Sequence, residues 1–546
     1  MIDDIKNWKE SSAFDRDTRN EVNNMNEEEL YSAFQSDLKF GTAGLRGILG
    51  AGTNRMNIYT VARAAIAICQ WVIDSNSVDP TAIIGYDIRH MSKEFAYLTA
   101  KIMDAFNIRY LITEDPISTP ELAFLTRDID AECGIMVTAS HNPREYNGYK
   151  VYKKGGSQIL DDDANYIENI MKEISFEDIY DYISKEDIFE VNLNPELDRY
   201  INENLSSSLL DLNEKKDLNI VYTPFNGCGL NPVTRLFDLA GYKYQIPKKH
   251  GRFDPDFTTI PYPNPEVAQT FEIPIELAKE IDADIIIATD PDADRMNIAV
   301  KDDNIYRVFN GNEVGALLTY WICLRRKEKG LNPGVIVKTI VTDDFGKTIA
   351  ESFGYKVVET LTGFKHISRI ATQLENSDDE FVMGYEESIG YEISDIVRDK
   401  DGIIASLYIA DLAQYFKNRG KSLIDLLDDL YDKYGYFSSN NFSITFEGAS
   451  ATEQMNNIMN KLRNDVDVFS EFKILNKVDY LNSKDEYMRT NAIVFNFKDA
   501  KLAIRPSGTE PKIKIYIYAN GNDKIKTDDL TNKIGDKTRW IMKNID

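Results

Sequence analysis

Short apolar runs, each followed by a polar loop and a helical pattern, constrain this chain more than any other feature. The runs 81–87 (TAIIGYD) and 133–138 (CGIMVT) have the length and composition of buried strands. Between them, the segment 91–106 (MSKEFAYLTAKIMDAF) has apolar residues at helical spacing. Comparable strand-like runs return along the chain at 218–227, 283–295, 334–341 and 355–360. This alternation predicts α/β layers.

The C-terminal part of the chain has a different pattern. Its strands alternate between apolar and polar residues, and two helices accompany them. The predicted strands are 442–448, 491–497, 500–506 and 512–519. Strands that pair locally in this way predict an α+β unit. The first forty residues have a polar helical pattern, and the turn-like segment 434–441 (YGYFSSNN) is interpreted as a linker.

These changes of pattern divide the chain into domains. At roughly 150 residues per domain, 546 residues suggest about three to four domains. The changes place boundaries near residues 205, 310 and 430. The predicted domains are therefore 1–205, 206–310, 311–430 and 431–546.

Composition excludes several classes of partner. The chain has 63 Lys and Arg against 89 Asp and Glu, a net charge of −26, and no basic run, which argues against nucleic acid binding. No apolar stretch approaches the ~18 residues of a membrane span. The N-terminal sequence MIDDIKNWKE is polar and acidic, unlike a signal peptide. The cysteines are too scattered for a disulfide framework or a zinc site, so we expect a cytoplasmic protein; they are Cys69, Cys133, Cys228 and Cys323.

The acidic motif DPDADR (290–295) follows a buried strand. Its carboxylates, Asp290, Asp292 and Asp294, can converge on one hard cation if the backbone turns there. An EF-hand is excluded because Arg295 and Lys301 stand where that loop needs Gly and Glu. From spacing alone, a solvated acidic turn is equally compatible. The preceding strand favours a ligand site, since ligands gather at the carboxyl ends of strands.

The motif TASHNP (138–143) also ends an apolar strand. Ser140 beside His141 suggests a nucleophile, but the glycines of a hydrolase elbow are missing, which argues against acyl transfer. Phosphoryl transfer to Ser140 and a plain Asx/Pro turn both stay open. Lys150, ten residues further on, could neutralise charge, or move a proton if its pKa is lowered; a surface lysine is the commoner fate.

Three further loops carry polar residues near predicted strands. The segment RPSGTEP (505–511) can form an anion-binding nest with an Arg fork, or a simple hairpin turn. The segments TGFKH (362–366) and GYEESIGY (384–391) suit recognition of sugar hydroxyls, or are plain loops. A Walker A loop is excluded because its first glycine is missing. A dinucleotide-binding fingerprint is excluded because the glycine-rich segment does not follow a strand.

Positive charge is concentrated in the candidate loops. The segments 39–46, 138–156, 362–370 and 501–514 together hold 12 Lys and Arg but only 2 Asp and Glu. In a chain of net charge −26, this distribution predicts an anionic small-molecule substrate that these loops share.

The motifs TASHNP, DPDADR, GYEESIGY and RPSGTEPKIKIY, in this order, closely resemble those of the α-D-phosphohexomutase family. The resemblance extends from about residue 40 to the C-terminus. FGTAGLRG (40–47) and the extended YEESIGY loop are most similar to the phosphoglucomutase/phosphopentomutase branch. The resemblance to this family implies three related α/β domains and a smaller C-terminal α+β domain around a central cleft. In chain order these would carry a phosphoserine loop, a metal loop, a sugar-recognition loop and a phosphate-binding loop.

The resemblance also implies roles for individual residues. Ser140 would carry the phosphoryl group and, with Asp290, Asp292 and Asp294, ligate Mg²⁺. Lys150 would be the general acid/base, with Arg46 and His141 near the phosphoserine. The substrate-binding residues implied are Arg295, Thr362, Gly363, Lys365, His366, Glu386, Ser388, Arg505, Ser507, Gly508 and Thr509.

The implied reaction interconverts glucose 1-phosphate and glucose 6-phosphate through a phosphoserine enzyme, with glucose 1,6-bisphosphate as intermediate and activator. Ribose or deoxyribose phosphate and mannose phosphate are the alternative substrates, and Tyr385 stands where many hexose-specific members have Gly. A non-catalytic sugar-phosphate sensor and a phosphatase are further alternatives. We expect a monomer or weak dimer.

Overall fold

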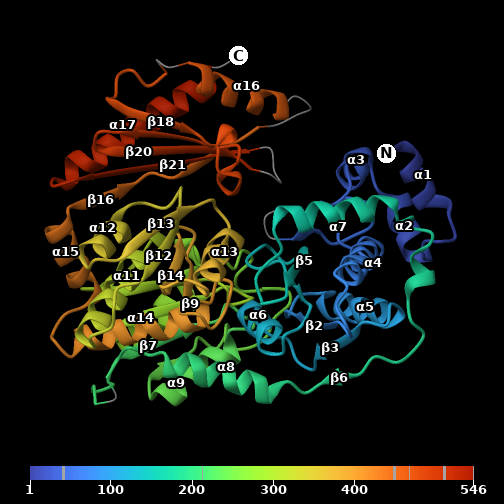
Figure 1. Cartoon of the computed structure of the whole chain (residues 1–546), viewed down its shortest axis with the longest axis horizontal. Coiled ribbons are helices and arrows are strands. Elements are labelled where there is room, and N and C mark those ends of the chain that lie inside the picture. The colour runs from blue at the N-terminus through green and yellow to red at the C-terminus, as the bar shows by residue number, and fades with distance from the viewer. Residues whose placement is uncertain (40–43, 212, 447–450, 466–467, 508–511, 545–546) are drawn as a thin grey trace.

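The computed structural model contains four β-sheets in chain order, with the first domain on the right of Figure 1 and the last at the top. It describes all residues except 40–43, 212, 447–450, 466–467, 508–511 and 545–546. One sheet lies within each of the four predicted domain ranges. The ends of those domains stay a prediction.

The first sheet has the strand order β1-β5-β4-β2-β3-β6, in which β4, β2, β3 and β6 pair in parallel and β5 pairs antiparallel with both β4 and β1. Alternate residues face opposite layers: Ile84 packs toward α4 and α5, and Ile83 toward α6. Its strands are β1 (Leu45–Ile48), β2 (Thr81–Tyr86), β3 (Arg109–Thr113), β4 (Cys133–Val137), β5 (Tyr146–Lys153) and β6 (Glu190–Val191). Its helices are α4 (Ile58–Asp74), α5 (Ser92–Ala105), α6 (Thr119–Asp128), α7 (Asp161–Glu173) and η1 (Ile179–Tyr182).

Three N-terminal helices form an extra layer on the first domain. They are α1 (Ile2–Glu10), α2 (Arg16–Asn24) and α3 (Glu27–Phe34). Trp8 stacks on Phe14 with 4.3 Å between ring centroids and meets Tyr59 of α4 edge-on at 5.4 Å. These buried aromatic contacts hold the polar N-terminal segment against the domain.

The second sheet repeats the central arrangement of the first. Its order is β11-β10-β9-β7-β8, with β9, β7 and β8 parallel and β10 and β11 antiparallel. Its strands are β7 (Asn219–Thr223), β8 (Lys243–Gln245), β9 (Ile285–Thr289), β10 (Met296–Asp302) and β11 (Ile305–Val308). The accompanying helices are α8 (Asn194–Ser206), α9 (Leu230–Ala240), η2 (Ala268–Phe271) and α10 (Glu272–Ile281).

The third sheet repeats the arrangement again, with the order β13-β12-β14-β15 and only β15 antiparallel. Its strands are β12 (Val335–Thr339), β13 (Lys356–Thr360), β14 (Phe381–Glu386) and β15 (Gly390–Ile393). Its helices are α11 (Gly311–Glu328), α12 (Phe345–Ser352), α13 (Phe364–Leu374), α14 (Gly402–Lys417) and α15 (Leu423–Tyr434).

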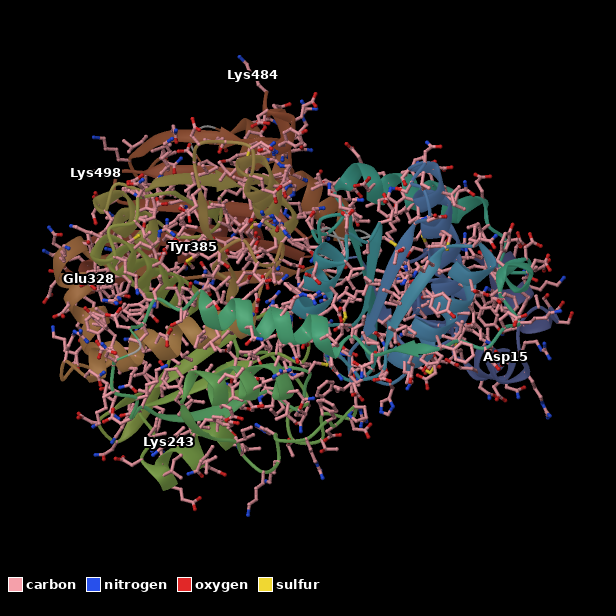
Figure 2. The ribbon with its side chains drawn as sticks, turned by 60° about the horizontal axis from the view of Figure 1, so that its bottom comes forward. Asp15, Lys243, Glu328, Tyr385, Lys484 and Lys498 are labelled. Carbon is pink, nitrogen blue, oxygen red and sulfur yellow. The ribbon has the colours of Figure 1, made fainter. Side chains whose placement is uncertain are left out.

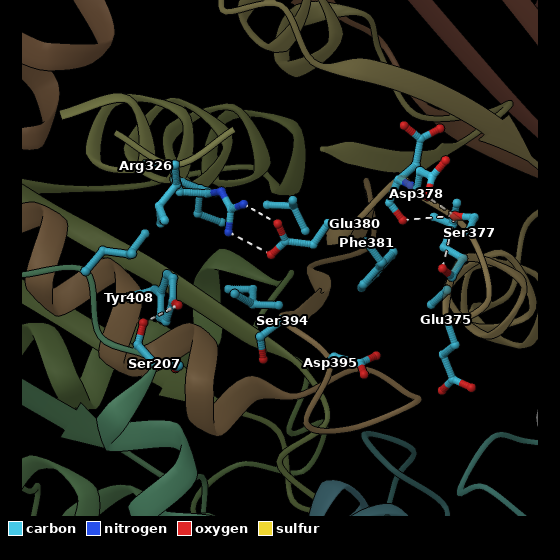
Figure 3. Close-up of a pocket in the computed structure, with 18 residues that line it drawn as sticks. Ser207, Arg326, Glu375, Ser377, Asp378, Glu380, Phe381, Ser394, Asp395 and Tyr408 are labelled. Carbon is cyan, nitrogen blue, oxygen red and sulfur yellow. Dashed lines mark hydrogen bonds and ion pairs between the residues drawn. The ribbon is translucent and has the colours of Figure 1, made fainter. Parts of the chain in front are cut away.

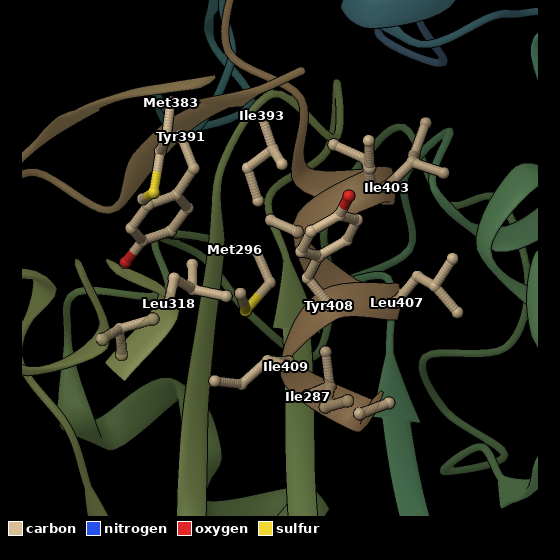
Figure 4. Packing of buried hydrophobic residues seen from close by; sticks show 14 of the residues in the cluster. Ile287, Met296, Leu318, Met383, Tyr391, Ile393, Ile403, Leu407, Tyr408 and Ile409 are labelled. Atoms are coloured by element: carbon tan, nitrogen blue, oxygen red, sulfur yellow. The ribbon is translucent and has the colours of Figure 1, made fainter. Parts of the chain in front are cut away.

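One helix joins the second and third domains into a single core. In Figure 4, Ile403 and Leu407 of α14 lie in the same cluster as Ile287 of β9 and Met383 of β14. The helix is buried almost throughout, so it has no polar face to present to water. The relative position of the two sheets is therefore fixed by apolar packing.

The C-terminal sheet is entirely antiparallel, with the order β16-β21-β20-β19-β18 and β17 beside β21. One face packs on helices, and the other contributes Tyr516 and Tyr518 to a cluster with Ile340 and Val341 of the third domain. Its elements are β16 (Tyr436–Ser439), β17 (Phe442–Thr445), α16 (Ala451–Asn464), β18 (Ile474–Asp479), η3 (Tyr480–Asn482), η4 (Glu486–Met488), β19 (Ile493–Phe497), β20 (Ala500–Pro506), β21 (Lys512–Gly521) and α17 (Lys524–Lys543). The predicted fold class, three related α/β domains followed by an α+β domain, is confirmed.

The interpretation of 434–441 as a linker is wrong, because Tyr436–Ser439 form strand β16 and pair with β21. Turn-forming residues suggested a loop, but backbone pairing with a long neighbouring strand overrides that local preference. The four cysteines are free and buried. Among the described residues, no helix is long and apolar enough to cross a membrane.

Tyr385 faces the core of the third domain. It is fully buried, and Figure 2 places it inside the molecule. A Cβ atom at Gly315 of α11 would lie 2.6 Å from its ring, and one at Gly346 of α12 would lie 2.3 Å from its hydroxyl. Both glycines therefore provide the space that this ring occupies. Because neighbouring residues on a strand face opposite sides, Glu386 takes the other face of β14.

We expect Gly346→Ala to destabilise the protein by about 1–3 kcal/mol through overpacking against the Tyr385 hydroxyl. Tyr385→Phe should be nearly neutral by itself, because that hydroxyl has no hydrogen-bond partner among the described residues. The double variant should recover at least half of the loss, as thermal unfolding would measure. A double variant no more stable than Gly346→Ala would contradict this packing.

Candidate active site

Ser140 lies in the turn between β4 and β5, at the carboxyl end of the parallel strands. Its backbone is left-handed (φ 53°), and its amide donates to Thr138 Oγ1 at 2.9 Å. Its hydroxyl donates to Asp290 Oδ2 at 2.7 Å and lies 3.2 Å from His141 Nδ1. Only 2% of Ser140 is exposed. The turn thus aims a buried hydroxyl at the acidic loop of the second domain.

Arg89, which the sequence analysis did not identify, holds this turn in place. Its buried guanidinium donates to four main-chain carbonyls, those of Ser140 (2.6 Å), Asn142 (2.5 Å), Pro143 (2.8 Å) and Tyr146 (3.2 Å). Asp87 compensates the charge at 3.3 Å. These bonds offset the cost of a left-handed serine, which is of order 1–3 kcal/mol. The signal available in the sequence was the polar loop that follows strand 81–86.

The three aspartates of the acidic motif form a compact buried group in the turn between β9 and β10. One carboxylate oxygen from each lies within 4.8 Å of the others. Asp292 Oδ1 and Asp294 Oδ1 are buried and have no hydrogen-bond partner in the part of the chain that the structure describes. Three converging carboxylates, two of which have an unpartnered oxygen, fit a hard divalent cation such as Mg²⁺.

Two lysines from different domains balance this acidic group. Lys150 Nζ of β5 lies 2.8 Å from both Asp292 Oδ2 and Asp294 Oδ2. Lys400 Nζ, which follows β15, lies 3.2 Å from Asp294 Oδ2. Burial raises the pKa of Asp294, but Lys150 and Lys400 outweigh it and hold that pKa well below its usual range. Burial, with Asp292 and Asp294 beside it, raises the pKa of Asp290.

Lys150 lies against the acidic group, in an electrostatic state that its sequence context did not predict. Burial lowers its pKa, and the two aspartates more than offset that effect, so the net pKa is raised. A proton-transfer role required a lowered pKa. Lys400 was missed because, in RDKDG (398–402), it stands between aspartates in a charged run that is typical of a solvated loop.

Arg46 and His141 flank the serine turn. Arg46 Nη1 of β1 donates to Asn142 Oδ1 at 2.8 Å. Burial, with Arg295 and Arg46 nearby, lowers the pKa of His141 well below its usual range. His141 is therefore neutral near pH 7 and can accept or donate a hydrogen bond at Ser140.

The turns of the second and third domains touch through their backbones. Met296 N donates to the carbonyl of Ile389 at 3.2 Å, and Arg295 Nη1 donates to the carbonyl of Ser388 at 3.3 Å. Glu386 accepts from Gly363 N at 2.7 Å, which joins the two predicted sugar-recognition loops. The structure thus brings Arg295, Glu386 and Ser388 close to the acidic group.

The remaining predicted substrate residues lie around the third and fourth domains. Arg505, near the end of β20, donates a hydrogen bond to Thr362. Lys365 reaches Asp161 of α7 at 2.5 Å, and burial lowers the pKa of His366 to about 4. Ser507 N donates to the carbonyl of Lys512 at 2.8 Å. Gly508 and Thr509 lie outside the described residues.

A cavity of about 510 Å³ lies elsewhere, at the opposite end of the third sheet (Figure 3). Phe381, the first residue of β14, lines it, whereas Glu386 is the last residue of that strand. The Arg326–Glu380 ion pair stands at its wall. None of the predicted site residues lines this cavity. Cavity size therefore does not locate the candidate site; the convergence of charged groups does.

Three related α/β domains bring a buried serine, an aspartate group and compensating lysines to one junction. Models of the phosphoglucomutase/phosphomannomutase alpha/beta/alpha domains I, II and III match residues 37–178, 198–303 and 310–434. A phosphoglucomutase from Staphylococcus haemolyticus is 35% identical over 506 residues, which are 89% of this chain and 91% of that protein. The chain belongs to the phosphoglucomutase/phosphomannomutase family.

Solved structures show the same fold. A putative phosphomannomutase from Thermus thermophilus has a TM-score of 0.70 at 20% identity and covers 93% of this chain and 100% of its own. A Paramecium phosphoglucomutase in an open form has a TM-score of 0.68 at 18% identity, with 93% and 96% covered. Family membership makes this chain a phosphohexomutase-type isomerase.

We expect Arg89→Lys to lower kcat by about tenfold or more, because one ammonium cannot replace a guanidinium that donates to four carbonyls, and a charged hydrogen bond contributes roughly 1.5–3 kcal/mol. Steady-state kinetics measures this. The control is Arg419→Lys, which changes an exposed arginine just after the end of α14. Unchanged kcat in Arg89→Lys would show that the turn does not need this guanidinium.

Mg²⁺ should raise the melting temperature of metal-free protein, because a cation that binds only the folded state stabilises it. The Asp292→Asn protein should lose most of this increase in melting temperature. Asp428→Asn, which changes an exposed side chain of α15, should keep it. Differential scanning fluorimetry with and without EDTA makes the comparison. An equal shift in the Asp292→Asn protein would place the binding elsewhere.

Proposed function

We propose that this protein is a phosphoglucomutase, which interconverts α-D-glucose 1-phosphate and glucose 6-phosphate through a phosphoserine at Ser140. The observation that carries the proposal is the 2.7 Å hydrogen bond from Ser140 Oγ to Asp290, within a buried triad that fits a cation. Ser140 is the one hydroxyl of the TASHNP turn that meets this triad directly. Relatives named phosphoglucomutase, which match most of the chain, support the same reading.

Asp290, Asp292 and Asp294, together with phosphorylated Ser140, are the residues that would hold Mg²⁺. When bound, the ion supplies positive charge against the negative charge of the phosphoryl group. Their burial matters because electrostatic interactions are stronger where water is excluded. Asp292 Oδ1 and Asp294 Oδ1, which have no hydrogen-bond partner among the described residues, fit this role.

The reaction consists of two phosphoryl transfers. In the first, the bond between phosphorus and Ser140 Oγ breaks, and a bond forms to the free hydroxyl oxygen of the sugar monophosphate, whose proton passes to a base. The resulting glucose 1,6-bisphosphate then reverses its orientation in the cleft. Its other phosphoryl group then returns to Ser140, and the leaving sugar oxygen regains a proton. The same bisphosphate phosphorylates free enzyme and so acts as activator.

Lys150 is the proposed acid and base. Its raised pKa depends on ion pairs with Asp292 and Asp294. A cation held by these carboxylates would add positive charge near the Lys150 ammonium, and that charge, like burial, would act to lower the pKa of the lysine. Arg46 and neutral His141 orient and stabilise the phosphoryl group at Ser140.

Substrate recognition is assigned to the third and fourth domains. Glu386 and Ser388 bind sugar hydroxyls, with Arg295 held beside them. Thr362, Gly363, Lys365 and His366 complete this wall. The non-transferring phosphate binds at Arg505, Ser507, Gly508 and Thr509. Tyr385 packs into the core, so its departure from the usual Gly changes no group at the sugar. This departure from the hexose pattern is therefore no argument against glucose, which we propose ahead of the pentose and mannose alternatives.

The proposal includes the division into 1–205, 206–310, 311–430 and 431–546, with one site loop in each. It also places the enzyme in the cytoplasm as a monomer or weak dimer. Free buried cysteines suit a reducing compartment. The partner is a small sugar phosphate, with neither nucleic acid nor membrane, as the net charge of −26 favours.

Wild-type protein should convert glucose 1-phosphate rapidly with Mg²⁺ and a trace of glucose 1,6-bisphosphate, and should carry one phosphate on Ser140 by mass spectrometry. Ser140→Ala should carry no phosphate at this position, and its activity should fall by at least about 10³-fold, because the phosphoryl acceptor is gone. Ser443→Ala, which changes an exposed side chain of β17, should keep both the phosphate and the activity.

Ribose 1-phosphate and mannose 1-phosphate belong in the same assay. Fast turnover of a pentose alone would keep the phosphoserine mechanism and replace the substrate. No turnover of any sugar by folded, phosphorylated protein would overturn the enzyme proposal in favour of a sugar-phosphate sensor. Rapid release of inorganic phosphate would indicate a phosphatase.

A further inference from the structure

Glu387, between the two proposed sugar-binding residues, has partners of a different kind. Its Oε2 accepts a hydrogen bond from Thr342 Oγ1 at 3.1 Å, and Thr339 Oγ1 lies 3.5 Å away. The two threonine hydroxyls are 2.8 Å apart, and both threonines are fully buried. Glu387 is thus bonded to the end of β12 and the loop that follows it.

That loop is also where the fourth domain docks. Tyr518 Oη of β21 donates to the carbonyl of Val341 at 2.6 Å, and Lys501 Nζ of β20 donates to the carbonyl of Thr342 at 3.2 Å. Ile340 and Val341 belong to the apolar cluster shared with Tyr518. We name residues 339–342 the docking segment. It is held by the sugar-recognition turn on one side and by the fourth domain on the other.

The backbone of the turn has little freedom of its own. A Cβ atom at Gly311, the first residue of α11, would lie 2.0 Å from the carbonyl oxygen of Glu387 and 2.9 Å from the amide of Ile389. Ile389 itself is left-handed, with φ 57°. The start of α11 therefore presses directly on the turn, which fixes where the Glu387 carboxylate can reach.

We propose that Glu387 is a positioning residue that couples the sugar-recognition turn, 386–388, to the docked fourth domain through Thr342. The inference rests on the proposed function, since that function assigns sugar binding to Glu386 and Ser388 and phosphate binding to Arg505. One substrate molecule spans both domains in that scheme. A fixed relation between the turn and the docking segment therefore sets how well both ends of the substrate are bound at once.

The kinetic test separates binding from chemistry. Glu387→Ala should raise KM for glucose 1-phosphate about tenfold with less than about a threefold change in kcat, since a buried hydrogen bond that orders a binding turn is lost. Glu387→Gln keeps an oxygen that can accept from Thr342, so its KM should stay within about threefold of wild type. Glu351→Ala, which changes an exposed side chain of α12 in the same domain, is the matched control.

A double-mutant cycle tests the coupling partner. Thr342→Val should raise KM about as much as Glu387→Ala, and the double variant should be no worse than either single variant. Tyr518→Phe should raise KM in wild type and have a smaller effect in the Glu387→Ala background. Additive effects, or a lower melting temperature with unchanged KM, would overturn the proposal and leave Glu387 a purely structural residue.

A second measurement does not depend on activity. In the full-length protein, Glu387→Ala should increase hydrogen exchange of peptides covering 339–342 and 512–519, whereas Glu351→Ala should not. Exchange that increases only within 386–388 would refute the coupling. If wild type turned over no sugar phosphate, the proposed function would fail, while the exchange result would still decide whether Glu387 couples the turn to the fourth domain.

Discussion

The structure depends on a buried acidic group that one domain supplies and others neutralise. Asp290, Asp292 and Asp294 belong to the second domain, Lys150 to the first and Lys400 to the third. Removing one partner from a buried ion pair costs about 3–5 kcal/mol, because the remaining charge stays desolvated. The relative placement of three domains is therefore tied to charge compensation at one junction. Thr119 of α6 strengthens this tie, since it donates to both the carboxylate and, through its amide, the carbonyl of Asp292.

Repetition of one topology explains why these groups meet. In each of the first three domains, the strand at one edge of the parallel set turns directly into an antiparallel neighbour: β4 into β5, β9 into β10, and β14 into β15. These equivalent turns hold Ser140, the aspartates and Glu386–Ser388. Each turn also contains one left-handed residue other than glycine, namely Ser140, Ala293 or Ile389. Such conformations cost energy and persist where the surroundings over-determine them, as they do at functional sites.

The fourth domain differs in both topology and attachment. Its antiparallel sheet buries one face on helices and offers the other to a short segment of the third domain. The attachment combines apolar contacts with hydrogen bonds to the carbonyls of Val341 and Thr342.

The sequence alone determined the class of the fold and which reactive side chains each loop offers. Buried strands such as β2, β4 and β9 were predictable, because their apolar runs differ sharply from the polar loops that follow. The antiparallel strands of the C-terminal sheet were predictable in part, but two others were missed: β5 (YNGYKVYK) mixes polar and apolar residues, and β16 was interpreted as a linker for its turn-forming residues. The equivalence of the three turns was also hidden, since they share topology and no residue pattern.

Only the tertiary structure decided the electrostatics. Lys150 and Asp292 are 142 positions apart in the chain, and nothing local to either residue fixes the sign of the shift in the lysine's pKa. Lys400 and Arg89 look like ordinary charged loop residues in the sequence, yet one neutralises the acidic group and the other holds the backbone of the serine turn. The physical reason is that motifs specify which atoms are present, whereas burial and the approach of distant charges set the energy of those atoms, and both arise only when the domains pack together.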